Sequence, residues 1–196
     1  MIIYLHGFLS SALSFKAGLL RRRMAELRRG REIACPELSQ KPGEAMRTLA
    51  ALVEAHLDGG VALIGSSLGG YYATVLSERY GVPSVLVNPA IRPYELLSQF
   101  VGPQTNLYTG ERSELTAADI DALRAMEVER ITPSRYLLMV QAGDEVLDYR
   151  DAVARYRGAA QRVFEGGDHG FSSFGDHVDE ALAFCGVPLT GLAAPV

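Results

Sequence analysis

The stretch VALIGSSLGGYYATVL, residues 61–76, decides the fold class of this chain. Its apolar run, residues 61–64, comes directly before Gly65-Ser66-Ser67-Leu68-Gly69, and a segment of helical character, residues 70–80, follows. A G-x-S-x-G pentapeptide between a strand and a helix is typical of a nucleophile elbow, a sharp turn that presents a serine hydroxyl at the carboxyl edge of a sheet. Glycines on both sides leave room for the close approach of the helix. The alternative is a glycine-rich turn with a hydrogen-bonded serine.

Short apolar runs alternate with segments of helical period along most of the chain. This alternation is typical of βαβ units, whose right-handed crossovers put helices on both faces of a mostly parallel sheet. We therefore predict a compact α/β fold with about six strands. The predicted strands are residues 2–5, 32–35, 61–64, 84–87, 136–141 and 162–165. One helix should run from Phe15 to Leu27 with Gly30 as its stop, and another should begin at Pro42 and end at Gly59-Gly60.

Residues 89–133 interrupt this alternation because they are long and carry little strand signal. We expect a helical insertion over the carboxyl edge of the sheet, where it either covers a pocket or simply packs. Thr116 and Asp119 resemble a capping box and should open a helix that runs to about Glu129. We expect residues 1–196 to form a single domain with a mobile tail, residues 187–196.

Composition excludes several classes of function. The 196 residues include 48% hydrophobic residues, which is enough for one core, and the net charge is -4. This charge disfavours nucleic acid as a partner, and no apolar run is long enough to span a membrane. An arginine-rich segment, residues 21–31, predicts a solvated helix face or, alternatively, a patch for a phosphate-bearing substrate such as an acyl-coenzyme A.

The cysteines and the N-terminus indicate the compartment. Cys35 and Cys185 are far apart and have no metal-ligand spacing, so we expect neither a disulfide nor a metal site. The apolar run at the N-terminus stops at His6-Gly7 and predicts a strand rather than an export signal. We expect a cytoplasmic protein that needs no cofactor.

A serine hydroxyl needs a base to remove its proton, and the base needs a carboxylate to fix its tautomer. In this fold the order along the chain is serine, acid, histidine, with each group in a turn after a strand. Asp144 follows the strand at residues 136–141, and His169 follows the strand at residues 162–165. We therefore predict Ser67, Asp144 and His169 as a catalytic triad.

Other candidates for the acid and the base are less well placed. Glu145 and Asp148 are near Asp144 in sequence, and Asp168 is more consistent with a turn residue than with a catalytic acid. For the base, the alternatives His56 and His177 lie in predicted helices, where a solvated or packed histidine is the common outcome.

A tetrahedral intermediate needs two preorganised donors for its oxyanion. One should be the amide of Leu68, directly after the nucleophile, and the other the amide of Phe8, in the turn after the first strand. Gly7 would let the backbone approach the substrate there. His6 is expected to brace this loop through its ring nitrogens. We predict that Tyr71 borders the substrate, although it and Tyr72 could also be packing residues.

Several motifs together resemble a known family. They are residues 4–8, 65–74, 87–93, 143–150 and 166–171, in collinear order over nearly the whole chain. These motifs are similar to those of the YqiA-type esterases, small bacterial members of the α/β-hydrolase superfamily. The resemblance implies an α/β-hydrolase fold and a cytoplasmic carboxylic-ester hydrolase for short acyl esters, with Ser67, Asp144 and His169 as its triad.

We therefore expect a serine carboxylesterase that acts on small-molecule esters. An acyl-coenzyme A thioesterase with the same site, and a non-catalytic binding module, are the alternatives. Asn88 ends a strand near the elbow, where it either holds the acid loop by hydrogen bonds or forms only a structural turn, whereas the residues assign no role to Arg92, no oligomeric state and no natural substrate.

Overall fold

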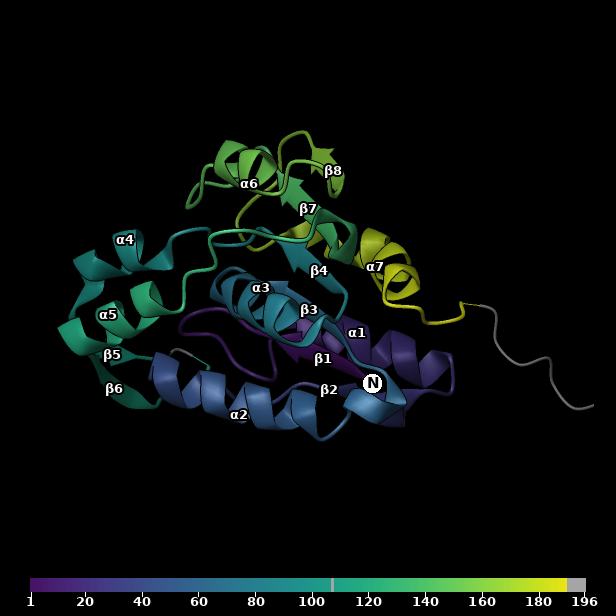
Figure 1. Ribbon diagram of the computed structural model, residues 1–196, viewed down its shortest axis with the longest axis horizontal. Coiled ribbons are helices and arrows are strands. Elements are labelled where there is room, and N and C mark those ends of the chain that lie inside the picture. Colours follow the sequence, from purple (N-terminus) through teal and green to yellow (C-terminus); the bar gives the residue numbers. More distant parts are fainter. Residues whose placement is uncertain (107, 190–196) are drawn as a thin grey trace, which may run out of the picture.

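A six-stranded parallel sheet forms the centre of the computed structural model, which describes residues 1–106 and 108–189 (Figure 1). The strand order is β2-β1-β3-β4-β7-β8. The strands are β1 (Ile2–Leu5), β2 (Ile33–Ala34), β3 (Ala62–Ser66), β4 (Ser84–Val87), β7 (Tyr136–Gln141) and β8 (Ala160–Phe164). Every pairing in this sheet is parallel. The central strands are buried along their whole length, which explains their nearly continuous apolar sequences.

Helices cover both faces of the sheet, as predicted (Figure 1). The helices are α1 (Phe15–Glu26), α2 (Pro42–Glu54), α3 (Leu68–Tyr80), α4 (Pro93–Leu97), α5 (Ala117–Ala125), α6 (Tyr149–Arg155) and α7 (Val178–Phe184). Short 3-10 turns lie at Gly30–Glu32, Leu57–Gly59, Ser98–Phe100, Pro133–Arg135 and Ser172–His177. Helices α2, α3 and α6 pack on one face, and α1 and α7 pack on the other.

Three predicted helix ends are wrong. Helix α2 ends at Glu54 rather than at Gly59-Gly60, and a separate 3-10 turn, Leu57–Gly59, follows it. Helix α1 ends at Glu26, and Arg28 rather than Gly30 adopts the left-handed conformation, with φ 59°. There the amide of Arg29 donates to the Met24 carbonyl and closes the helix. Helix α5 opens with the predicted capping box between Thr116 and Asp119 but ends at Ala125, earlier than expected.

The insertion differs from the prediction because it is not purely helical. Besides α4 and α5 it contains an antiparallel hairpin, β5 (Gly102–Thr105) and β6 (Arg112–Leu115). In Figure 1 these four elements gather at one end of the sheet, beyond α3. The hairpin has almost no apolar sequence signal because most of its residues are partly or fully exposed.

Most of the predicted mobile tail, residues 190–196, lies outside the described residues. Its first residue is ordered by packing: Val187 is 8% exposed and belongs to the core on the α1 and α7 face. The arginine-rich segment also makes internal contacts. Arg23 forms a two-pronged ion pair with Asp179 of α7, and Arg21 donates to the carbonyls of Ala12 and Cys35.

No helix in the described part of the chain combines the length and the hydropathy that a membrane span requires.

Candidate active site

Ser67 lies between β3 and α3 in a strained conformation, with φ 54° and ψ -122°. Such a backbone is costly for a residue other than glycine and persists only where its surroundings hold it. Its amide donates to the Val87 carbonyl, and its carbonyl accepts from the amides of Gly70 and Ala90.

The flanking glycines are needed for close packing of the backbone. A Cβ atom on Gly65 would lie 2.3 Å from the Gly69 carbonyl oxygen, and one on Gly69 would lie 2.1 Å from the Leu5 carbonyl oxygen. Both distances are far below a van der Waals contact. The elbow therefore fits directly against the end of β1 only with glycine at these positions.

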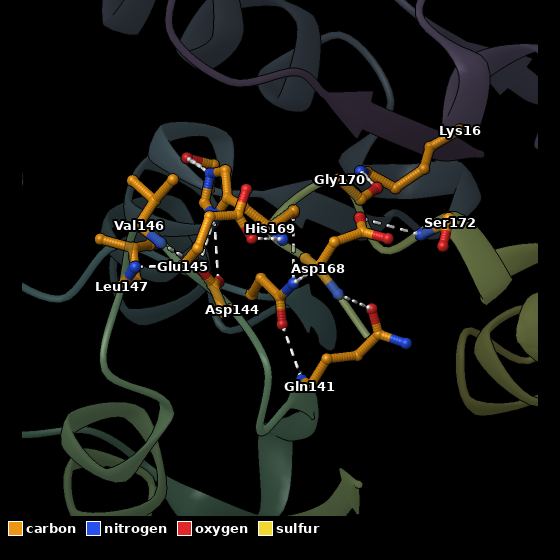
Figure 2. Close-up of polar contacts among 12 residues, drawn as sticks. Lys16, Gln141, Asp144, Glu145, Val146, Leu147, Asp168, His169, Gly170 and Ser172 are labelled. Carbon is orange, nitrogen blue, oxygen red and sulfur yellow. Dashed lines mark hydrogen bonds and ion pairs between the residues drawn. The ribbon is translucent and has the colours of Figure 1, made fainter. Parts of the chain in front are cut away.

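The structure brings Ser67, His169 and Asp144 into one line of contacts. His169 Nε2 lies 3.0 Å from Ser67 Oγ, and His169 Nδ1 lies 3.0 and 2.9 Å from the two carboxylate oxygens of Asp144. Figure 2 shows the imidazole above the Asp144 carboxylate, with the loops after β7 and β8 meeting there.

The Asp144 carboxylate is held in its ionised form. Burial by itself raises its pKa, but hydrogen bonds from His169 and from the amides of Leu147 and Val146 outweigh burial, so the pKa lies below its usual value. Both amides donate to Oδ1 at 2.9 Å. An ionised carboxylate on Nδ1 directs the lone pair of Nε2 toward the serine.

The other acidic residues near the triad have different partners. Glu145 accepts a hydrogen bond from the backbone amide of His169 at 2.9 Å, so it supports the loop between β8 and the 3-10 turn, residues 165–171, which we call the histidine loop. Asp148 is the N-cap of α6. Asp168 accepts from the Ser172 amide at 3.3 Å, which agrees with its interpretation as a turn residue.

Two polar residues fasten the histidine loop to the sheet. Asn88 follows β4; its Oδ1 accepts from the Gln141 amide, and its Nδ2 donates to the carbonyls of Asp168 and His169. Gln141 at the end of β7 accepts from the Asp168 amide through Oε1. Of the two roles considered for Asn88, these contacts favour the hydrogen-bonding one over a merely structural turn. Gln141 is a residue that the sequence did not single out, because its signal is no more than a polar residue that ends an apolar strand.

Phe8 and Leu68, whose amides are the predicted oxyanion donors, both line a cavity that Ser67 also lines. Within residues 1–106 and 108–189, no group accepts a hydrogen bond from the amide of Phe8 or of Leu68. Gly7 is close to the nucleophile, because a Cβ atom there would lie 3.1 Å from Ser67 Cβ.

His6 braces the same loop. It is 2% exposed, its Nδ1 lies 3.0 Å from the Gly7 carbonyl, and its Nε2 accepts from the Leu38 amide. Burial lowers its pKa, which agrees with a neutral ring that donates through Nδ1.

Two cavities meet at Ser67 and His169. The first, of about 500 Å³, is lined by Ser10, Ser14, Lys16 and Ser172 and also by aromatic and aliphatic side chains, among them Phe8, Leu9 and Phe15. We call it the polar cavity because Lys16 and Asp168 lie on it. The second, of about 210 Å³, is lined by Leu96, Leu97, Phe100 and Leu147 among others, and we call it the apolar cavity. Helix α4 of the insertion contributes to the apolar cavity, so the insertion does border the site.

Tyr71 does not line either of these cavities. It is 5% exposed, and its hydroxyl donates to the Leu123 carbonyl of α5 at 2.6 Å. Its position in α3 directs the ring toward the insertion, so the packing alternative describes this residue better than the substrate-binding prediction. Arg92 is an exposed residue that pairs with Glu95.

Within the described residues, no group of three or more His, Cys, Asp and Glu side chains has an arrangement that could hold a metal ion. Cys35 and Cys185 are both free thiols.

Comparison with solved structures identifies the fold. A presumed hydrolase from Agrobacterium vitis S4 superimposes with a TM-score of 0.76 at 18% identity, covering 94% of this chain and 87% of that one. Est1E from Butyrivibrio proteoclasticus superimposes with a TM-score of 0.70 at 15% identity, covering 92% of this chain and 84% of that one. Mouse alpha/beta hydrolase domain-containing protein 10 superimposes with a TM-score of 0.67 at 16% identity, covering 93% of this chain and 89% of that one. The chain therefore has the α/β-hydrolase fold.

A family model provides the closer relationship. The model described as "Uncharacterised protein family (UPF0227)" matches residues 1–186, and this is the YqiA family whose motifs the sequence resembles. The chain belongs to the UPF0227 family.

Proposed function

We propose that this protein is a serine carboxylesterase that hydrolyses short-acyl esters of small molecules through an acyl-enzyme. One observation carries the proposal: the hydroxyl of Ser67, the imidazole of His169 and the carboxylate of Asp144 are in continuous hydrogen-bonding contact beside open cavities. Hydrogen-bond contact from nucleophile to base and from base to an orienting carboxylate is what acyl transfer by serine requires.

The first half of the reaction forms the acyl-enzyme. His169 Nε2 takes the proton of Ser67 Oγ as this oxygen attacks the ester carbonyl, and Asp144 stabilises the resulting imidazolium. The amides of Phe8 and Leu68 are suited to stabilise the oxyanion, because neither has an acceptor among the described residues and Leu68 is the first residue of α3, at the positive end of the helix dipole. His169 then gives its proton to the leaving alcohol oxygen.

The second half releases the acid. Water donates a proton to His169 Nε2 and attacks the acyl carbon, and the proton returns to Ser67 Oγ when the second tetrahedral intermediate collapses. The apolar cavity is suited to the acyl chain, and its small volume of about 210 Å³ favours short chains. The free thiols of Cys35 and Cys185 favour a reducing compartment, so we assign the reaction to the cytoplasm.

Covalent labelling tests the proposal directly. A fluorophosphonate should modify Ser67 in the folded protein, as located by peptide mass mapping, and should still do so in Ser66→Ala, which removes the neighbouring hydroxyl. Ser67→Ala and His169→Ala should each lower kcat by several orders of magnitude, and the double variant should lose little more, because the residues act as a unit. Absence of labelling would favour a binding module, and additive losses would contradict the mechanism.

The choice between ester and thioester needs its own assay. An oxygen ester and a thioester of the same acyl chain should be compared by kcat/KM on the purified protein. A dominant thioester rate would replace the carboxylesterase assignment with a thioesterase.

A further inference from the structure

Lys16 lies in the first turn of α1 and lines the polar cavity beside Ser67. Figure 2 shows its side chain reaching the histidine loop, where Nζ donates to the Gly170 carbonyl at 2.5 Å. No carboxylate in the described part of the chain forms an ion pair with it. Lys16 is thus a cation at the substrate cavity whose charge is not neutralised by direct contact.

The position of Lys16 is unfavourable for a positive charge. Burial lowers its pKa to about 8, even though the more distant carboxylates of Asp168 and Asp144 act in the opposite direction. The first turn of α1 contains no acidic residue, and a cation at that end is opposed by the helix dipole. An anion in the polar cavity would offset both effects.

Two further features at this end of α1 suit an anion. Ser14, the N-cap, is 6% exposed and lines the polar cavity, but its Oγ has no hydrogen-bond partner among the described residues. The amides of Phe15 and Lys16 in the first turn also lack an acceptor in that part of the chain. Donors of this kind at a helix N-terminus favour carboxylate and phosphate oxygens.

The apolar cavity on the other side of Ser67 has no comparable charge, because α4 supplies mostly aliphatic side chains there. We propose that the polar cavity binds a carboxylate or phosphate group carried by the ester substrate, and that Lys16 is the residue that selects for it. This inference rests on the proposed esterase function. It makes the substrate an ester with a short apolar arm and an anionic arm.

Asp168 is the group that works against this selection. Its carboxylate lines the same cavity, so it repels an anion while Lys16 attracts it. Removing the charge of Asp168 should therefore strengthen the preference for an anionic ester, whereas removing that of Lys16 should weaken it.

Matched esters test the proposal on the purified protein. Ethyl butyrate is the neutral reference. The butyryl esters of glycolate and of ethylene glycol monophosphate carry the anion on the alcohol, and monoethyl succinate carries it on the acyl arm. Acid release in a pH-stat gives kcat/KM for each, and the ratio of anionic to neutral ester is the readout.

Lys16→Gln should lower this ratio about tenfold to a hundredfold, mainly through KM, because a charge-assisted hydrogen bond is lost. Lys16→Arg should retain most of the ratio, and Asp168→Asn should raise it. The matched control is Arg22→Gln, which removes the same charge from an exposed position of the same helix. The wild-type ratio should also fall as pH rises through about 8, since Lys16 then loses its proton. Asp168, Asp144 and His169 face the same region, so the same pH series is measured on Lys16→Gln, in which the fall of the ratio near pH 8 should be absent.

The proposal is overturned if Lys16→Gln lowers the rates of neutral and anionic esters equally, because Lys16 would then only brace Gly170. It is also overturned if no anionic ester exceeds ethyl butyrate in kcat/KM while Ser67 is labelled normally, a result that leaves the esterase function intact. If Ser67 is not labelled, calorimetric titration of Ser67→Ala with the glycolate ester decides: binding that Lys16→Gln abolishes supports the anion site, and equal binding refutes it.

Discussion

Replacing Asn88 with alanine should reduce both stability and catalysis, because its side chain forms hydrogen bonds to the end of β7 and to the histidine loop. Asn88 is 2% exposed and has φ 41°. Its Oδ1 accepts from the Gln141 amide at 2.9 Å, and its Nδ2 donates to the carbonyls of Asp168 at 3.0 Å and His169 at 3.2 Å. Alanine keeps none of these contacts.

The expected loss of stability has two parts. A buried amide without an acceptor, here that of Gln141, costs about 1–3 kcal/mol. Alanine tolerates a left-handed backbone less well than asparagine does, which adds about 1–2 kcal/mol. The free energy of unfolding should therefore fall by about 2–5 kcal/mol. Since the backbone of His169 loses its anchor, kcat should fall by about tenfold to a hundredfold, as expected for a catalytic group displaced by a fraction of an ångström to one ångström.

Urea denaturation followed by circular dichroism measures the stability, and ester hydrolysis well below the unfolding transition measures kcat. Tyr136→Phe is the control, because its hydroxyl donates to Glu78 Oε1 at 2.6 Å at the start of β7, the opposite edge of the sheet from Ser67. It should lose about 1.5–3 kcal/mol with no change in kcat. The anchoring role would be refuted if Asn88→Ala kept its full kcat, or if Tyr136→Phe lost as much kcat as Asn88→Ala does.

Three further changes test other parts of the structure. Asp144→Asn should lower kcat severely, whereas Asp148→Asn, which only weakens the cap of α6, should be mild; comparable losses would mean that the wrong carboxylate has been assigned. Gly69→Ala should lower the free energy of unfolding by at least about 3 kcal/mol, because the new Cβ would collide with the Leu5 carbonyl. Gly59→Ala, whose Cβ would meet no atom within 4 Å, should change the free energy of unfolding by no more than about 0.5 kcal/mol. Urea denaturation measures both. Burial raises the pKa of Glu78, but hydrogen bonds from Tyr136 and Thr132 outweigh burial, so the folded-state pKa is lowered. The stability that ionised Glu78 contributes is therefore present above its unfolded-state pKa and is lost as pH falls through the lower folded-state pKa. Glu78→Gln lacks this contribution, so its Tm should decline less steeply on the acid side.

The sheet and the elbow could be predicted from sequence because they depend on local patterns. Strands buried on both faces are continuously apolar, as in residues 136–140, and the carboxyl ends of parallel strands lie on one edge regardless of loop detail. That rule is why Asp144 and His169 could be placed beside Ser67 across separations of 77 and 102 residues.

The rest depended on contacts that leave no local pattern. The hairpin β5–β6 has few buried residues, so no apolar alternation marks it. Tyr71 is next to the elbow in sequence, but the turn of α3 directs it toward Leu123. Lys16 reaches Gly170 across 154 residues, and its only sequence signal is a cation in a helix turn where acids are preferred.

The short segment that follows β4 links the nucleophile to the base. The Val87 carbonyl accepts from the Ser67 amide at 3.1 Å, the Ala90 amide donates to the Ser67 carbonyl at 3.0 Å, and the Asn88 side chain between them holds the carbonyls of Asp168 and His169. The same segment thus stabilises the strained backbone of the serine and sets the position of the imidazole. Because a strained conformation persists only where its surroundings determine it fully, the 3.0 Å contact between Ser67 Oγ and His169 Nε2 depends on residues 87–90 as much as on the triad itself.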